Sequence, residues 1–163
     1  MSEFFAATLG ARQPENALAW STLFAPDAAR TAEGWTIAEA FAAILFAAAT
    51  CDGEVAAVEQ EELLALVHRS RALKAYTPAQ LAQINGKIVA RLRDEPTALR
   101  DACAALQEDM RLPIFAHALD LILADGELNT DEADFLNTLI LNLKLNREDV
   151  SKIADVIVLK NSY

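Results

Sequence analysis

The chain has 163 residues, 53% of them apolar, and carries a net charge of −10 from 24 acidic and 14 basic residues. So large an apolar fraction argues against disorder, and so much negative charge disfavours nucleic acid and anionic membrane surfaces as partners. The same charge attracts cations and the basic surfaces of other proteins.

The cysteines and the apolar runs point to the cytosol. Cys51 and Cys103 both lie in apolar, helix-like sequence, which is typical of small buried side chains in a reducing compartment. No basic cluster of the kind that opens a secretory signal follows Met1. The longest apolar run, residues 40–51, is shorter than the roughly 20 residues that span a bilayer. We expect a cytoplasmic protein that does not insert into a membrane and that binds a protein partner, membrane-associated partners included.

Residues 1–35 are the least regular part of the chain. Two prolines and Gly34 interrupt short helical pieces. Large aromatic side chains favour burial, so three of them are expected to pack this segment onto the rest of the protein: Trp20, Phe24 and Trp35. We predict an irregular N-terminal segment, residues 1–35, that packs on a helical domain, residues 36–163.

From residue 36 onward the sequence predicts helices and no strand, because alanine and leucine dominate and β-branched residues are sparse. Helix starts are predicted at a Thr36/Glu39 capping box, at Pro78, Pro96 and Pro113, at Asn129 or Thr130, and at Asn146. A further helix is predicted over residues 58–71. Short connections favour antiparallel neighbours. The predicted fold is a single compact all-α bundle of about seven to eight helices.

Apolar residues at helical spacing predict the inward faces of these helices. In the first strong helix they are Ile37, Phe41, Ile44, Leu45 and Ala48, and in the last helix they are Val150, Ile153, Ile157 and Val158.

The chain resembles itself at an offset of 73 residues. Asp52-Gly53-Glu54-Val55 aligns with Asp125-Gly126-Glu127-Leu128, and Glu59 aligns with Glu132. An apolar helix precedes each turn and an amphipathic helix follows it. We therefore predict two pseudo-symmetric helix-turn-helix repeats, around residues 36–71 and 112–145, that cover each other's apolar faces.

Acidic residues gather on both turns. Residues 52–62 and 125–134 hold ten of the 24 acids and no Lys or Arg, so their charges repel each other unless a cation or a partner neutralises them. One interpretation is local. Each glycine supplies a positive φ, the aspartate before it accepts backbone N–H groups, and Glu59 and Glu132 reach back in capping boxes.

A second interpretation is a divalent-cation site whose metal the sequence does not specify. Each turn matches positions 5–12 of an EF-hand loop, but apolar residues and one threonine occupy the first and third ligand positions. Neither turn is an ordinary calcium loop, so a site requires the two turns to converge. The candidate ligands are Asp52, Glu54, Glu59, Asp125, Glu127 and Glu132, with His117 as a nitrogen ligand. His117 aligns with Ile44 in the repeat, which favours a half-buried core position as the alternative.

A third interpretation makes the acidic face a docking surface for a basic protein segment, which needs no ligand geometry. An enzyme is disfavoured, because the sequence contains no Gly-rich phosphate loop, no nucleophile elbow and no HExxH motif.

The paired turns resemble those of the TerB-like tellurite-resistance family, and of the related N-terminal domain of membrane-anchored DnaJ-like co-chaperones. Residues 49–54 with Glu59, and residues 123–127 with Glu132, carry the resemblance, which covers about residues 36–145. It implies an all-helical pseudo-symmetric domain, a role in tellurite or general stress resistance as an adaptor, and a metal site on these acids. The long N-terminal segment departs from the family pattern. We expect a non-enzymatic protein that uses its acidic face to bind a divalent cation, a protein partner or both. The alternative is a metal-free adaptor.

Overall fold

The structure is a computed structural model that describes residues 24–53, 70 and 73–162. Over these residues the regular secondary structure is all helical, as predicted. The elements are α3 (Ile37–Ala49), α5 (Pro78–Asp94), α6 (Ala98–Ala105), α7 (Glu108–Ile122), the 3-10 turn η1 (Leu123–Asp125), α8 (Thr130–Asn142) and α9 (Arg147–Lys160). These six α-helices are fewer than the seven to eight expected for the whole chain. The helix predicted over residues 58–71 lies outside the described residues.

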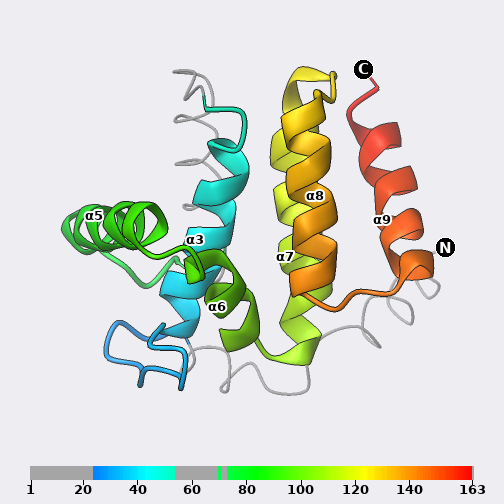
Figure 1. The fold of residues 1–163 in the computed structure, drawn as a ribbon. Helices are drawn as coiled ribbons and strands as arrows, with labels where there is room; N and C mark the ends of the chain where they lie inside the picture. The colour runs from blue at the N-terminus through cyan, green and yellow to red at the C-terminus, as the bar shows by residue number, and fades with distance from the viewer. Residues whose placement is uncertain (1–23, 54–69, 71–72, 163) are drawn as a thin grey trace, which may run out of the picture.

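Helix α3 lies at the centre of the packing and contacts α5, α6 and α7. Alanines at its inner positions, such as Ala38, Ala40 and Ala43, are fully buried and allow the neighbouring backbones to approach closely. In Figure 1, α3, α7, α8 and α9 run lengthwise, while α5 lies crosswise beside α3. Helix α8 returns antiparallel to α7, and α9 packs on α7. None of the described helices is both long and apolar enough to cross a membrane.

Polar side chains define where the helices begin. The predicted capping box at Thr36 is confirmed: the Glu39 N–H donates to Thr36 Oγ1 over 3.1 Å, and Glu39 Oε2 accepts from the Thr36 N–H over 3.1 Å. Thr77 caps α5 in the same way with Gln80, and Pro78 follows at the first helical position. Asn146 caps α9, as predicted.

The start predicted at Pro113 is wrong. Helix α7 begins five residues earlier, at Glu108, and Pro113 lies inside it. Glu108 and Asp109 in the first turn favour this start, because carboxylates suit the positive end of the helix dipole. Pro113 lacks the N–H that would donate to the Asp109 carbonyl, and its ring crowds that carbonyl, yet the helix continues through it to Ile122. The preceding helix, α6, correspondingly ends at Ala105, before the predicted end near residue 108.

The inward face predicted for α9 is correct at Val150, Ile153 and Ile157, which pack against the core, but not at Val158, which is 54% exposed. Val158 directly follows Ile157, so the 100° step per residue turns it away from α7. Helix α9 has no fully buried residue. Polar contacts at its end help to hold it, because the Lys160 ammonium donates to Asp120 Oδ1 on α7 over 2.7 Å.

The described part of the N-terminal segment, residues 24–35, packs on the helical domain. Phe24 is buried and meets Phe41 of α3 edge to face, with ring centroids 6.1 Å apart. Trp35 is 2% exposed. Arg30 forms an ion pair with the buried carboxylate of Glu39 over 2.8 Å. The core role predicted for Phe24 and Trp35 is confirmed, whereas Trp20 lies outside the described residues.

Candidate functional site: two glycine turns

The first acidic turn follows the end of α3. Gly53 has φ +80°, and its N–H donates to the Thr50 carbonyl over 3.1 Å. A side chain at that φ would be strained, so glycine is the favoured residue for this turn. Asp52, directly before it, is half-buried. Glu54 and Glu59 lie outside the described residues.

The second turn has the same local geometry. Helix α7 tightens into η1, and Gly126 follows with φ +84°. The Gly126 N–H donates to the Leu123 carbonyl over 3.1 Å, three residues back, as Gly53 does to Thr50. The predicted positive φ at both glycines is confirmed. The side chain of Asp125 is not among those described, and Glu127 is exposed.

Glu132 is a buried helix-capping residue. Its side chain is on α8, and the residue is 6% exposed. Glu132 Oε2 accepts from the Asn129 N–H over 2.8 Å, and the Glu132 N–H donates to Asn129 Oδ1 over 2.9 Å. The capping interpretation is therefore correct at this position. Oε2 of Glu132 is therefore used in capping the start of α8.

The two turns lie at the same end of the molecule. Helices α3 and α7 pack against each other and run in the same direction, so the turns that end them, at Gly53 and Gly126, are on the same side of the bundle (Figure 1). We call this end, with Asp52, Asp125, Glu127 and Glu132, the acidic pole. Within the described part of the chain, no group of three or more His, Cys, Asp or Glu side chains is arranged to hold a metal ion. The side chains of Glu54, Glu59 and Asp125 are not described, so convergence of the two turns stays a prediction.

His117 lies away from the acidic pole. It precedes Asp125 by eight residues, a rise of about 12 Å along a helix. Its ring packs edge to face on Phe41 with a centroid distance of 5.9 Å. Burial lowers the pKa of His117, the nearby Asp120 raises it and Lys160 lowers it. This half-buried position matches the alternative drawn from its alignment with Ile44.

Cys103 behaves as a structural residue. It is fully buried in α6, and burial raises the pKa of its thiol to about 12, outweighing the opposite effect of Arg111. A thiol with so high a pKa is not a nucleophile at neutral pH. Cys51, at the first turn, is half-buried and its thiol donates to the Ala48 carbonyl over 3.2 Å.

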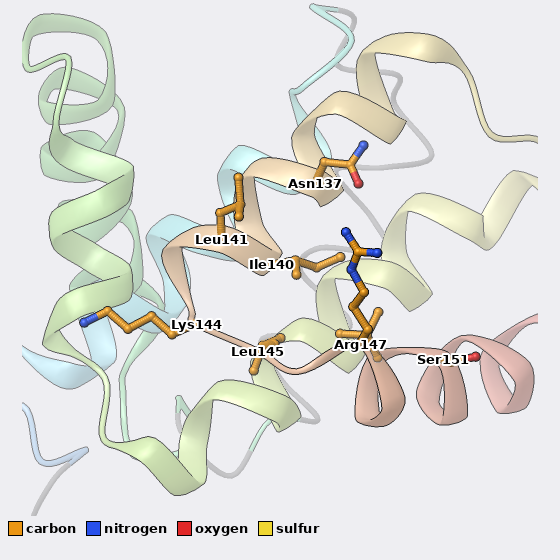
Figure 2. Close-up of a pocket in the computed structure, with 8 residues that line it drawn as sticks. Asn137, Ile140, Leu141, Lys144, Leu145, Arg147 and Ser151 are labelled. Carbon is orange, nitrogen blue, oxygen red and sulfur yellow. The ribbon is translucent and has the colours of Figure 1, made fainter.

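A groove of about 550 Å³ lies between the end of α8 and the start of α9 (Figure 2). Sequence patterns did not reveal it. Its apolar lining comes from Ile140, Leu141, Leu145 and Val150, and its charged lining comes from Lys144 and Arg147. Lys144, which lines the groove, has the left-handed φ of +55° and lies where the chain passes from α8 to α9.

These features define an all-helical domain with two acidic glycine turns at one end. A family model described as "Tellurite resistance protein TerB" matches residues 38–155. The chain therefore belongs to the TerB family, as the resemblance of the two turns implied. No curated protein and no solved structure gives a match.

Proposed function

We propose that this chain acts in tellurite or general stress resistance as a non-enzymatic protein whose acidic pole binds a divalent cation, a protein partner or both. The observation that carries the proposal is the parallel packing of α3 and α7, which brings two similar acidic turns to one end of the molecule. Membership of the TerB family supports the link to tellurite.

Cation binding is proposed beside capping because the acids gather at one end of the molecule, where like charges repel each other unless a cation neutralises them. Glu132 itself caps α8 through Oε2. Glu127 is exposed and lies next to Gly126, so a hydrated cation can reach it. Hard cations such as calcium and magnesium prefer carboxylate oxygens at about 2.0–2.6 Å. We propose one site shared by the two repeats, with Asp52, Glu54 and Glu59 from the first turn and Asp125, Glu127 and Glu132 from the second.

Isothermal titration of the protein with calcium, magnesium, manganese and zinc tests the cation site. We expect heat at sub-millimolar concentration for at least one of these ions, with one cation bound per chain. Exposed aspartates elsewhere provide a matched control, since Asp94→Asn with Asp155→Asn should leave the heat unchanged. The absence of heat for all four ions would exclude the cation site.

The metal-free adaptor is the second candidate, because the acidic pole attracts basic segments without any ligand geometry. It predicts that a lysine-rich peptide binds equally well with and without a chelator. Neutralising Asp52, Glu54, Asp125 and Glu127 together should then abolish binding while the helical circular dichroism is retained. If the peptide binds as tightly to this variant, the acidic pole is not a docking surface.

The role in resistance is tested by growth on tellurite. A bacterial host that lacks its own TerB should regain tolerance when it expresses this chain, and should lose it again when Asp52 and Asp125 are both changed to Asn. Equal tolerance with both forms would separate the resistance from the acidic pole.

A further inference from the structure

We propose that the groove between α8 and α9 docks an acidic amphipathic helix of a partner protein. The groove is a second binding surface, opposite in charge to the acidic pole and at the other end of α8. Helix α8 has 13 residues, so about 20 Å of helix separates the two surfaces. This proposal does not depend on cation binding.

Charge selects the partner. The chain carries a net charge of −10, yet the charged residues that line the groove are Lys144 and Arg147 and none is acidic. Six of the described lysines and arginines form ion pairs, among them Lys152 with Glu148 and Lys160 with Asp120. Among the described residues, no ion pair involves Lys144 or Arg147. Two cations that pair with none of the described acids favour carboxylates supplied by a partner.

The apolar lining selects an amphipathic segment. Leu141 is 77% exposed although it borders Ile140 and Leu145, so a large apolar side chain is left in water beside an apolar concavity. Figure 2 shows Lys144 on one side of Ile140 and Leu145, with its ammonium pointing away from them, and Arg147 on the other side, with its guanidinium reaching past Ile140 toward Asn137. A helix that inserts one or two leucines and carries glutamates on both sides of them matches this arrangement. Helix-in-groove recognition uses such apolar anchors at i, i+3, i+4 and i+7.

A protein segment fits better than a lipid surface. The lining is concave, whereas a membrane requires a convex or flat contact. A chain of net charge −10 is also repelled by anionic lipid as a whole. A short acidic helix can enter the groove while it stays remote from the acidic pole.

The probe is a synthetic 18-residue helix of leucine and glutamate, compared with the same helix in which lysine replaces glutamate. Titration into ¹⁵N-labelled full-length protein should shift the amide signals of residues 140–151 with the acidic helix alone. We expect a Kd of about 10–300 μM at low salt that weakens several-fold at 300 mM salt, because screening acts on exposed charges.

Two charge-matched variants locate the site. Lys144→Glu with Arg147→Glu should weaken binding at least tenfold. Lys74→Glu with Lys87→Glu makes the same change in net charge at exposed lysines outside the groove and should have a much smaller effect. Leu141→Ser should also weaken binding, whereas Leu159→Ser, at another exposed leucine, should not. Circular dichroism checks that each variant is folded. If a charge variant fails to fold, the comparison of Leu141→Ser with Leu159→Ser still tests the site.

Several outcomes would overturn the proposal. One is that the amide signals of residues 140–151 do not shift at about 1 mM acidic helix. Another is that the basic helix binds equally well. A third is that the groove variants and their controls lose equal affinity for the acidic helix. Shifts of the same residues caused by anionic vesicles or by self-association, with none from the peptide, would also contradict it.

Discussion

The guanidinium of Arg91 stacks on Trp35, with its carbon 3.9 Å from the ring centroid. The same guanidinium donates to the carbonyls of Gly34, over 3.0 Å, and Glu33, over 2.8 Å. Its Nε donates to Glu95 over 2.7 Å. One side chain on α5 therefore fastens the described end of the N-terminal segment to the helical domain. The planar fork of arginine is needed for this, since lysine cannot stack and donate in several directions at once.

Replacing Arg91 with lysine should destabilise the protein. The change removes the stacking and at least one of the carbonyl hydrogen bonds, so we expect a loss of about 1–3 kcal/mol in the free energy of unfolding, measured by urea denaturation. Arg93→Lys is the control, because Arg93 is exposed and bonds only its neighbour Asp94. Similar losses for the two variants would mean that the stacking contributes nothing specific.

Glu132→Gln separates capping from cation binding. Glutamine can close a capping box, as Gln80 does with Thr77 in this chain, so the free energy of unfolding should change by less than about 0.5 kcal/mol. A neutral amide is a weaker ligand for a hard cation, so calcium or magnesium affinity should fall at least tenfold. Denaturation and titration on the same sample measure both effects. Unchanged cation affinity would assign Glu132 to capping alone.

Lys144→Gly should stabilise the fold. Lys144 occupies the left-handed position after α8, where the Leu145 N–H donates to the Ile140 carbonyl and the Lys144 N–H to the Leu141 carbonyl, each over 3.1 Å. Glycine adopts this conformation without a Cβ penalty, although it also gains entropy when unfolded, so we expect a net gain of about 0.5–1 kcal/mol. Lys87→Gly, inside α5, should instead cost about 1 kcal/mol. A loss at both positions would contradict the left-handed turn. The acidic helix should still bind this variant more weakly, because a cation is gone.

His117 should make stability depend on pH near neutrality. Burial holds the pKa of His117 below its ordinary value of 6.5, so the unfolded chain binds a proton at this residue before the folded protein does. Stability is therefore full at pH 8 and falls as the pH drops through 6.5 toward the lowered folded pKa. In His117→Gln this part of the slope, measured by urea denaturation between pH 8 and 5, should disappear.

Asp120 should act at lower pH. Burial raises the pKa of Asp120, but hydrogen bonds from Lys160 and Asn161 outweigh it and hold the pKa below its ordinary value. The hydrogen bonds from Lys160 and Asn161 to Asp120 therefore persist between pH 8 and 5, the range over which the effect of His117 is measured. If the slope between pH 8 and 5 is the same in His117→Gln as in the parent, His117 is not its source.

Local chemistry made the helix starts predictable from the sequence. Thr36, Asn129 and Asn146 each offer an oxygen to a nearby backbone N–H, a contact that depends on residues only three positions apart. The two glycine turns were predictable for the same reason, because each depends on a glycine and a carbonyl three residues before it. Pro113 does not mark a helix start, although proline favours the first turn, because the two acids upstream of it occupy the first turn of α7.

Features that depend on tertiary packing were not predictable. The stacking of Arg91 on Trp35 joins residues 56 positions apart, and nothing in either local sequence specifies it. At the groove, Lys144 adopts a left-handed conformation that sequence patterns would assign to glycine. The acidic residues of the pole were visible at once, because their repetition at a fixed offset is a property of the sequence alone.

The most direct test of the central claim is a cycle of Asp52→Asn, Asp125→Asn and the double variant, titrated with the cation that the parent protein binds most tightly. A single site shared by the two turns predicts one cation per chain. Each single variant should lower its affinity at least tenfold, and the double variant should lose less than the two single losses combined. Two cations per chain, one lost with each single variant, or an affinity that neither substitution changes, would contradict a shared acidic site.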